Sequence, residues 1–201
     1  MQKSLFAIAC VALITWAAAS CKGEGDTTGE TTQPVAERTP EDYLEQGKQF
    51  ALETKAVLGK NLVQAIQTQG AAGAVAFCSE RAYPLTDSMA VALGASLKRV
   101  SDRNRNPQNA ANAAELAYIQ ECRSLQEQGM PLKPRLTESG DRVTAYYPIL
   151  AEAMCLQCHG TPESQVLPET LAAIRQKYPD DKATGFAEGD LRGIWVVEMQ
   201  R

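Results

Sequence analysis

The stretch RLTESGDRVTAYYPI, residues 135–149, decides the fold class of this chain. Polar and apolar side chains alternate on both sides of Ser139-Gly140-Asp141, and this pattern predicts two antiparallel strands joined by a tight turn. Weaker alternation in ASLKRVS, residues 95–101, predicts another strand, and RGIWVVEMQ, residues 192–200, is expected to end the chain as a strand. We therefore expect an antiparallel sheet.

A long N-terminal helix is predicted to precede this sheet. Thr39 is a suitable N-cap, and Pro40 fits the first helical position. An apolar face then continues to Gly70, a natural helix stop. Residues 72–93 form a second helical stretch, which Pro84 is expected to interrupt because proline has no backbone N–H to donate.

Two more helices are predicted between and after the strands. Asn112 and Glu115 resemble a capping box at the start of a helix that runs to Gln128. PETLAAIRQKYP, residues 168–179, is a further helix that a proline closes, and a short helix is expected at a cysteine pair near residue 155. Helices followed by antiparallel strands with a helix between them indicate an α+β domain.

The first twenty residues have the features of a secretory signal. Lys3 is their only charge, and the apolar run over residues 5–19 is shorter than the ~20 residues that a membrane-spanning helix needs. Residues 1–20 are therefore expected to be a signal peptide. The end of this segment, Ala18-Ala19-Ser20-Cys21, resembles the cleavage site of bacterial lipoproteins and predicts a lipid on Cys21; plain secretion is the alternative.

Residues 21–40 are expected to be a flexible tether, because Gly, Thr and Glu dominate them and little in them can be buried. Residues 41–201 remain as one domain. This organisation predicts an extracytoplasmic protein that a lipid anchors to the membrane facing the periplasm, and Lys22 favours the outer membrane. The net charge of −4, without a run of Lys or Arg, argues against nucleic acid as a partner.

The segment AMCLQCHG, residues 153–160, carries the strongest chemical signal. Cys155, Cys158 and His159 form a C-x-x-C-H motif, and His159 is the only histidine of the chain. In a c-type haem site the two thiols bind the porphyrin covalently and the histidine reaches the iron from the same turn. A secretory signal is consistent with this chemistry, so we predict one covalently attached haem c.

Other uses of the cysteines stay open. Four thiolates could hold zinc, although Cys78 and Cys122 are solitary where structural zinc sites usually draw on two close pairs. A thiol oxidoreductase would place its C-x-x-C after a strand in a βαβ unit, which we do not find. For a haem, no second histidine exists to bind the other face of the iron. The remaining candidates are no ligand at all, Cys78, Cys122, Met89, Met130, Met154 and Met199.

The chain resembles a family of extracytoplasmic, PAS-like proteins with a single haem, a domain long catalogued without a function. The resemblance is carried by AVAFCSERA (74–82), SDRNRNPQNAANAAE (101–115), YYPILAEAMCLQCHG (146–160) and YPDDKATGFAEGDLRGIWVV (178–197). It implies a PAS-like antiparallel sheet with flanking helices, His159 as the proximal ligand and the Cys78 thiolate as the distal ligand. Without the resemblance, Cys78 could equally be a buried free thiol or form a disulfide with Cys122.

Further cofactor contacts are predicted around the motif. Arg103 and Arg105, in an asparagine-rich loop, could pair with the haem propionates because arginine binds carboxylates bidentately; a solvated loop is the alternative. The same two interpretations, a contact to a propionate or a solvated position, apply to Arg99 and Arg192. Tyr147 is expected to offer a flat surface to the porphyrin. Other side chains that could do so are Tyr146, Met154, Phe77, Phe186 and Trp195.

The resemblance implies a redox or gas sensor rather than an enzyme, and an anionic Cys78 thiolate would favour ferric iron. A small gas could then be a ligand, and an unidentified signalling or electron-transfer protein would be the partner. A monohaem electron-transfer cytochrome is the main alternative. A peroxidase-like haem enzyme is a weaker one, because no second histidine is present to act as an acid or base.

Overall fold

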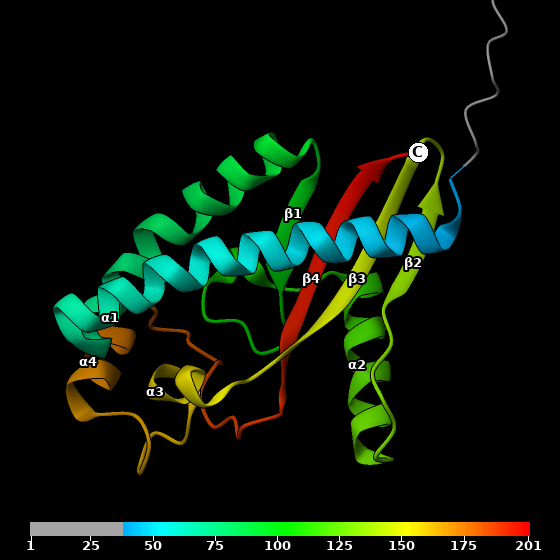
Figure 1. Cartoon of the computed structure of the whole chain (residues 1–201). Helices are drawn as coiled ribbons and strands as arrows, with labels where there is room; N and C mark the ends of the chain where they lie inside the picture. Colours follow the sequence, from blue (N-terminus) through cyan, green and yellow to red (C-terminus); the bar gives the residue numbers. More distant parts are fainter. Residues whose placement is uncertain (1–37) are drawn as a thin grey trace, which may run out of the picture. The chain divides into compact units, whose positions relative to one another are not determined.

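The structure is a computed structural model that describes residues 38–201. The predicted signal peptide, the predicted lipidation site Cys21 and most of the predicted tether lie outside these residues. The elements, in chain order, are α1 (Pro40–Leu93), β1 (Ser96–Val100), η1 (Pro107–Asn109), α2 (Ala113–Glu127), β2 (Arg135–Ser139), β3 (Arg142–Leu150), η2 (Ala153–Cys155), α3 (Leu156–His159), α4 (Pro168–Lys177) and β4 (Leu191–Gln200) (Figure 1). The predicted α+β class is confirmed.

Helix α1 consists of two arms joined at a bend. Thr39 caps its start as predicted: its hydroxyl oxygen accepts a hydrogen bond from the Asp42 amide at 3.2 Å, and its own amide donates to the Asp42 carboxylate at 2.8 Å. At Gly70 the backbone has φ 70° and ψ 174°, a region that only glycine enters without strain. The first arm (residues 40–69) ends there. The second arm (residues 71–93) runs back towards β1 (Figure 1).

The prediction that Pro84 interrupts the second arm is wrong. The helix continues through Pro84 to Leu93. Proline removes one backbone hydrogen bond, but Ala82, Leu85 and Leu93, on both sides of it, pack against the same apolar core. Burial of these side chains keeps the two flanking turns in line.

The sheet has four antiparallel strands in the order β1-β4-β3-β2. The predicted hairpin is β2 and β3, and Gly140 in its turn has φ 61°. Strand β4, the last in the sequence, lies between β1 and β3, so that Trp195 is paired with Arg99 on one side and with Tyr147 on the other. The sheet therefore becomes complete only when the C-terminal strand is in place.

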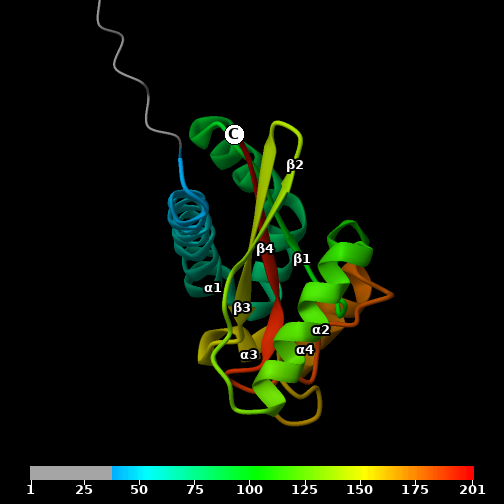
Figure 2. The ribbon, with the colours of Figure 1, turned by 90° about the vertical axis from the view of Figure 1, so that its right-hand side faces the viewer.

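The two faces of the sheet are covered by different helices, as Figure 2 shows. Helix α1 covers one face, over a core that includes Leu97, Val143 and Val197. Helix α2 covers the other face, where Ile119 and Cys122 pack against strand residues such as Ile194. The predicted capping box at the start of α2 is present, with the Asn112 side chain accepting from the Glu115 amide at 3.0 Å.

Helices α3 and α4 lie at the end of the sheet where β3 finishes (Figure 1). A small apolar cluster fastens α4 to the second arm of α1. Its buried members are Val75, Val166 and Ile174, and Cys158 packs against them. Strand β3 and the second arm of α1 therefore bring the cysteine motif and Cys78 to one end of the molecule.

Across residues 38–201, no helix combines the length and apolar character that crossing a membrane requires.

Gly47 in the first arm allows the close packing of α1 on the sheet. A methyl group added there would lie 2.5 Å from Tyr147 Oη and 3.1 Å from Met199 Cε. We expect Gly47→Ala to lower the free energy of unfolding by about 1–3 kcal/mol, because an overpacked core must shift. Gly59→Ala in the same helix meets nothing within 4 Å and should raise it by about 0.5–1 kcal/mol. Urea unfolding of both variants measures the difference, and equal shifts would contradict the packing argument.

Candidate functional site

The cysteine motif lies on a single tight turn. The chain leaves β3 at Ala151, whose amide donates to the Asp190 carbonyl at 2.8 Å, and enters η2 and α3 directly. Cys155 is the N-cap of α3, and Cys158 and His159 follow within that helix. Positions i, i+3 and i+4 of a helix share one face. Both thiols and the imidazole are therefore presented together, all half-buried.

The imidazole of His159 is held in a defined orientation. Its Nδ1 lies 2.7 Å from the Ala183 carbonyl oxygen, which can only accept, so Nδ1 carries the proton and Nε2 keeps its lone pair. The ring meets Phe186 edge-on, with centroids 6.4 Å apart. Burial, with the nearby Arg192 and Arg105, holds the pKa of His159 well below its usual 6.5. A neutral imidazole with a free Nε2 is the form that binds a metal.

Cys78 lies in the same region, on the second arm of α1. It stands one helical turn after Val75, which belongs to the cluster that Cys158 packs against. Burial and the neighbouring Cys158 raise the pKa of the Cys78 thiol, while Arg99 and Arg105 act in the opposite direction. Cys122, by contrast, is fully buried on α2, on the other face of the sheet. The four cysteines at positions 78, 122, 155 and 158 are free thiols, so the alternative disulfide between Cys78 and Cys122 is absent.

Arg105 joins three segments at this site. Its guanidinium makes two hydrogen bonds of 3.1 Å to the Asp181 carboxylate. It also donates to the Cys158 carbonyl at 2.6 Å and to the Ala183 carbonyl at 3.3 Å. Arg105 therefore ties together, next to the motif, the loop after β1, the helix α3 and the segment before β4.

Arg103 and Arg192 stack on the Phe186 ring, with guanidinium carbons 3.9 Å and 5.2 Å from its centroid. Arg103 donates to the carbonyls of Lys182 and Thr184. Arg192 donates from Nη1 to the Arg103 carbonyl at 3.2 Å, but its buried Nε has no partner among residues 38–201. Both arginines and His159 therefore contact the same ring, that of Phe186.

Some predicted site residues are not brought to the motif. The Tyr147 hydroxyl donates to the Leu44 carbonyl at 2.7 Å, and its ring packs in the core beneath the first arm of α1. Met199 is buried in the same core. Asp181 and Ala183, which orient Arg105 and His159, were missed, although both lie in the stretch 178–197 that carries the family resemblance. Phe186 was one of several aromatic candidates and is the one beside His159.

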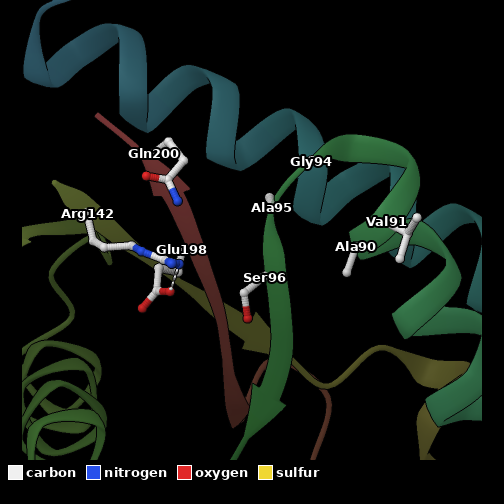
Figure 3. A pocket seen from close by; sticks show the side chains of 8 residues that line it. All are labelled: Ala90, Val91, Gly94, Ala95, Ser96, Arg142, Glu198 and Gln200. Atoms are coloured by element: carbon white, nitrogen blue, oxygen red, sulfur yellow. Dashed lines mark hydrogen bonds and ion pairs between the residues drawn. The ribbon is translucent and has the colours of Figure 1, made fainter.

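A surface pocket away from the motif and the positions of metal-binding side chains also bear on the choice of site. A surface pocket of about 360 Å³ lies between the α1–β1 connection and the end of β4, at the opposite end of the sheet from α3 (Figure 3). Its two charged side chains, Arg142 and Glu198, pair with each other at 2.6 Å. No group of three or more His, Cys, Asp or Glu side chains within residues 38–201 is placed to hold a metal ion, so the zinc alternative has no supporting geometry.

Fold and site together define an α+β domain that presents a C-x-x-C-H turn beside a cluster of half-buried arginines. The chain belongs to the Tll0287-like family, whose sequence model matches residues 33–200. A solved structure with the same fold is that of the cyanobacterial heme-protein Tll0287. It has a TM-score of 0.60 and 22% sequence identity, and the match covers 82% of this chain and 98% of that one. No curated protein matches the sequence.

The lowered pKa of His159 predicts a pH dependence for the cofactor-free chain. Unfolding exposes the imidazole, which then takes up a proton near its ordinary pKa of 6.5, whereas the folded chain keeps it neutral. Below that pH the unfolded state binds more protons, so the free energy of unfolding should fall by up to about 1.4 kcal/mol per pH unit. Above it, the histidine contributes no slope.

Urea unfolding of the wild type and His159→Gln between about pH 7.5 and about pH 5.5 measures this difference. Because the chain has one histidine, the variant removes the whole contribution while the carboxylates titrate alike in both proteins. Parallel pH profiles for the two proteins would show that His159 is not kept neutral by the fold.

Proposed function

We propose that this protein binds one haem c covalently through Cys155 and Cys158, with His159 as an axial ligand of the iron. The observation that carries the proposal is the single turn on which both thiols share a face with a neutral, oriented imidazole. A carbonyl hydrogen bond to Nδ1 fixes the ring and raises the basicity of Nε2, as in many metal-binding histidines. Membership of a family whose solved structure is called a heme-protein supports the same cofactor.

The surroundings of the motif fit a haem. Two thiols and an imidazole are the donor set of c-type attachment. Arg99, Arg103 and Arg105 lie close enough to Arg192 to lower its pKa, and Asp181, the carboxylate that acts on Arg192 in the opposite direction, is paired with Arg105. Such an excess of half-buried positive charge suits a cofactor that carries carboxylates.

Cys78 is the proposed ligand on the other side of the iron. It comes from a different element than His159, and it lies close enough to Cys158 for the two thiols to influence each other. Burial keeps the free thiol protonated, but a metal ion deprotonates a thiol that coordinates it. Arg99 and Arg105 favour the resulting thiolate electrostatically.

A bound haem would supply a one-electron couple and, wherever a ligand position opens, a site for a small gas. An anionic thiolate at Cys78 favours the ferric state. Reduction would favour its protonation and release, and the second arm of α1 would transmit the change to an unidentified partner. We therefore assign the protein to redox or gas sensing in a PAS-like domain, held at the periplasmic face of the outer membrane by a lipid on Cys21. Electron transfer by a six-coordinate haem is the second candidate.

Covalent attachment is tested in a host able to attach haem c. We expect the wild type to keep its pigment after denaturing electrophoresis and the Cys155→Ser/Cys158→Ser double variant to lose it, because no thioether can form. The pigment is detected by haem staining and by the absorption spectrum. A colourless wild type would refute the proposal.

The ligand role of Cys78 is tested by Cys78→Ala, with Cys122→Ala as the matched control on the other face of the sheet. We expect Cys78→Ala to change the ferric absorption spectrum and to raise the reduction potential, because an anionic ligand is lost. Cys122→Ala should leave both unchanged. Three identical ferric spectra would remove Cys78 from the ligand set. A thiolate that stays bound in the ferrous wild type would favour electron transfer over sensing.

A further inference from the structure

The arginines beside the motif differ in how well their donors are satisfied. Arg105 donates to the Asp181 carboxylate and to two carbonyls through its Nε and Nη2. Arg103 donates to two carbonyls of the segment before β4. Asp102, the acidic residue next to Arg103, is committed to Arg123 at 2.8 and 2.9 Å. Among residues 38–201 no carboxylate forms an ion pair with Arg103 or Arg192, although Asp181 lies close enough to Arg192 to favour its charged form.

Arg192 is the exception. Its Nη1 donates to the Arg103 carbonyl, but its Nε is buried and makes no hydrogen bond with any described residue. A buried donor without an acceptor is rare in native proteins, because leaving it unsatisfied destabilises the fold. Burial and the neighbouring Arg105 lower the pKa of Arg192 to about 10, which still leaves it charged at neutral pH.

We propose that Arg192 binds a carboxylate of the cofactor through its Nε edge, an inference that rests on the haem proposed above. The guanidinium is 5.2 Å from the Phe186 ring, which in turn meets the His159 ring at 6.4 Å. A haem propionate beside His159 is therefore within reach of this side chain. The Nε–Nη2 edge of arginine matches a carboxylate bidentately, and Nη1, the group already used, lies on the opposite side.

This placement gives Arg103 and Arg105 a different role from the one that the sequence suggested. Their donors hold the loop after β1 against the segment before β4, so they position Phe186 and His159. Arg103 and Arg192 stack on the same ring, and only Arg192 has an unused buried donor. The two side chains therefore form a matched pair for an experiment.

The experiment compares wild type, Arg192→Gln, Arg192→Lys and Arg103→Gln, each with haem attached. Loss of the Arg192 charge beside the haem should favour the ferric state about tenfold, which lowers the reduction potential by about 59 mV. The freed propionate should also titrate nearer neutral pH and make the potential of Arg192→Gln depend on pH between about 5 and about 8. Arg192→Lys should restore most of the potential, because it restores the charge. Arg103→Gln also removes a positive charge near the motif and should lower the potential, but without making it depend on pH, because the propionate keeps its partner.

Thermal unfolding of the haem-free Cys155→Ser/Cys158→Ser chain, with and without Arg192→Gln, separates a binding role from a structural one. We expect Arg192→Gln to stabilise the haem-free chain slightly, because it removes a half-buried cation whose Nε has no acceptor, and to destabilise the haem-bound protein. Destabilisation of both forms, or an Arg192→Gln potential equal to that of the wild type, would overturn this inference alone. So would a pH-dependent potential in Arg103→Gln instead. A wild type without covalent haem would overturn the proposed function as well.

Discussion

The ion pair of Arg105 and Asp181 is the interaction on which the site depends. Both side chains are nearly buried, 12% and 9% exposed. The guanidinium also reaches the Cys158 carbonyl, so one charged group fastens the loop after β1 and the segment before β4 to the motif helix. Removal of either partner would leave a buried charge and destabilise the fold by about 3–5 kcal/mol. The short α3 turn has few contacts of its own, and this pair supplies the rigidity that it lacks.

The same ion pair is connected to the His159 imidazole by one shared acceptor, the Ala183 carbonyl oxygen. The Ala183 carbonyl accepts from His159 Nδ1 at 2.7 Å and from Arg105 at 3.3 Å. A carbonyl shared with a cation is a weaker acceptor for the imidazole N–H, which makes Nε2 less basic than an unshared carbonyl would. Fold stability and ligand strength are therefore coupled, because the group that fixes the position of α3 also adjusts the donor that α3 presents.

Local patterns were enough to predict most elements. The hairpin at residues 135–149, the capping box of Asn112 and the helix stop at Gly70 depend on neighbours in the sequence, and all three are confirmed. The continuation of α1 through Pro84 and the central place of β4 depend on tertiary packing, which no local pattern contains. The residues of the site also divide into those that the local sequence predicts and those that depend on tertiary structure. The three residues of the motif lie close together in the sequence, whereas the choice of Arg192 over Arg103 and Arg105 required knowing which donors the fold already uses.

The two sides of the proposed haem site are restrained in different ways. His159 is fixed by a carbonyl, by the Phe186 ring and by the short turn that carries both thiols. Cys78 is on an arm of α1 that begins at the Gly70 bend. The ion pair that links this arm to α4, Lys177 with Glu80, is exposed and contributes little, about 0–1 kcal/mol. The apolar cluster of Val75, Val166 and Ile174 therefore does most to hold the second arm against α4 and to keep Cys78 beside the motif.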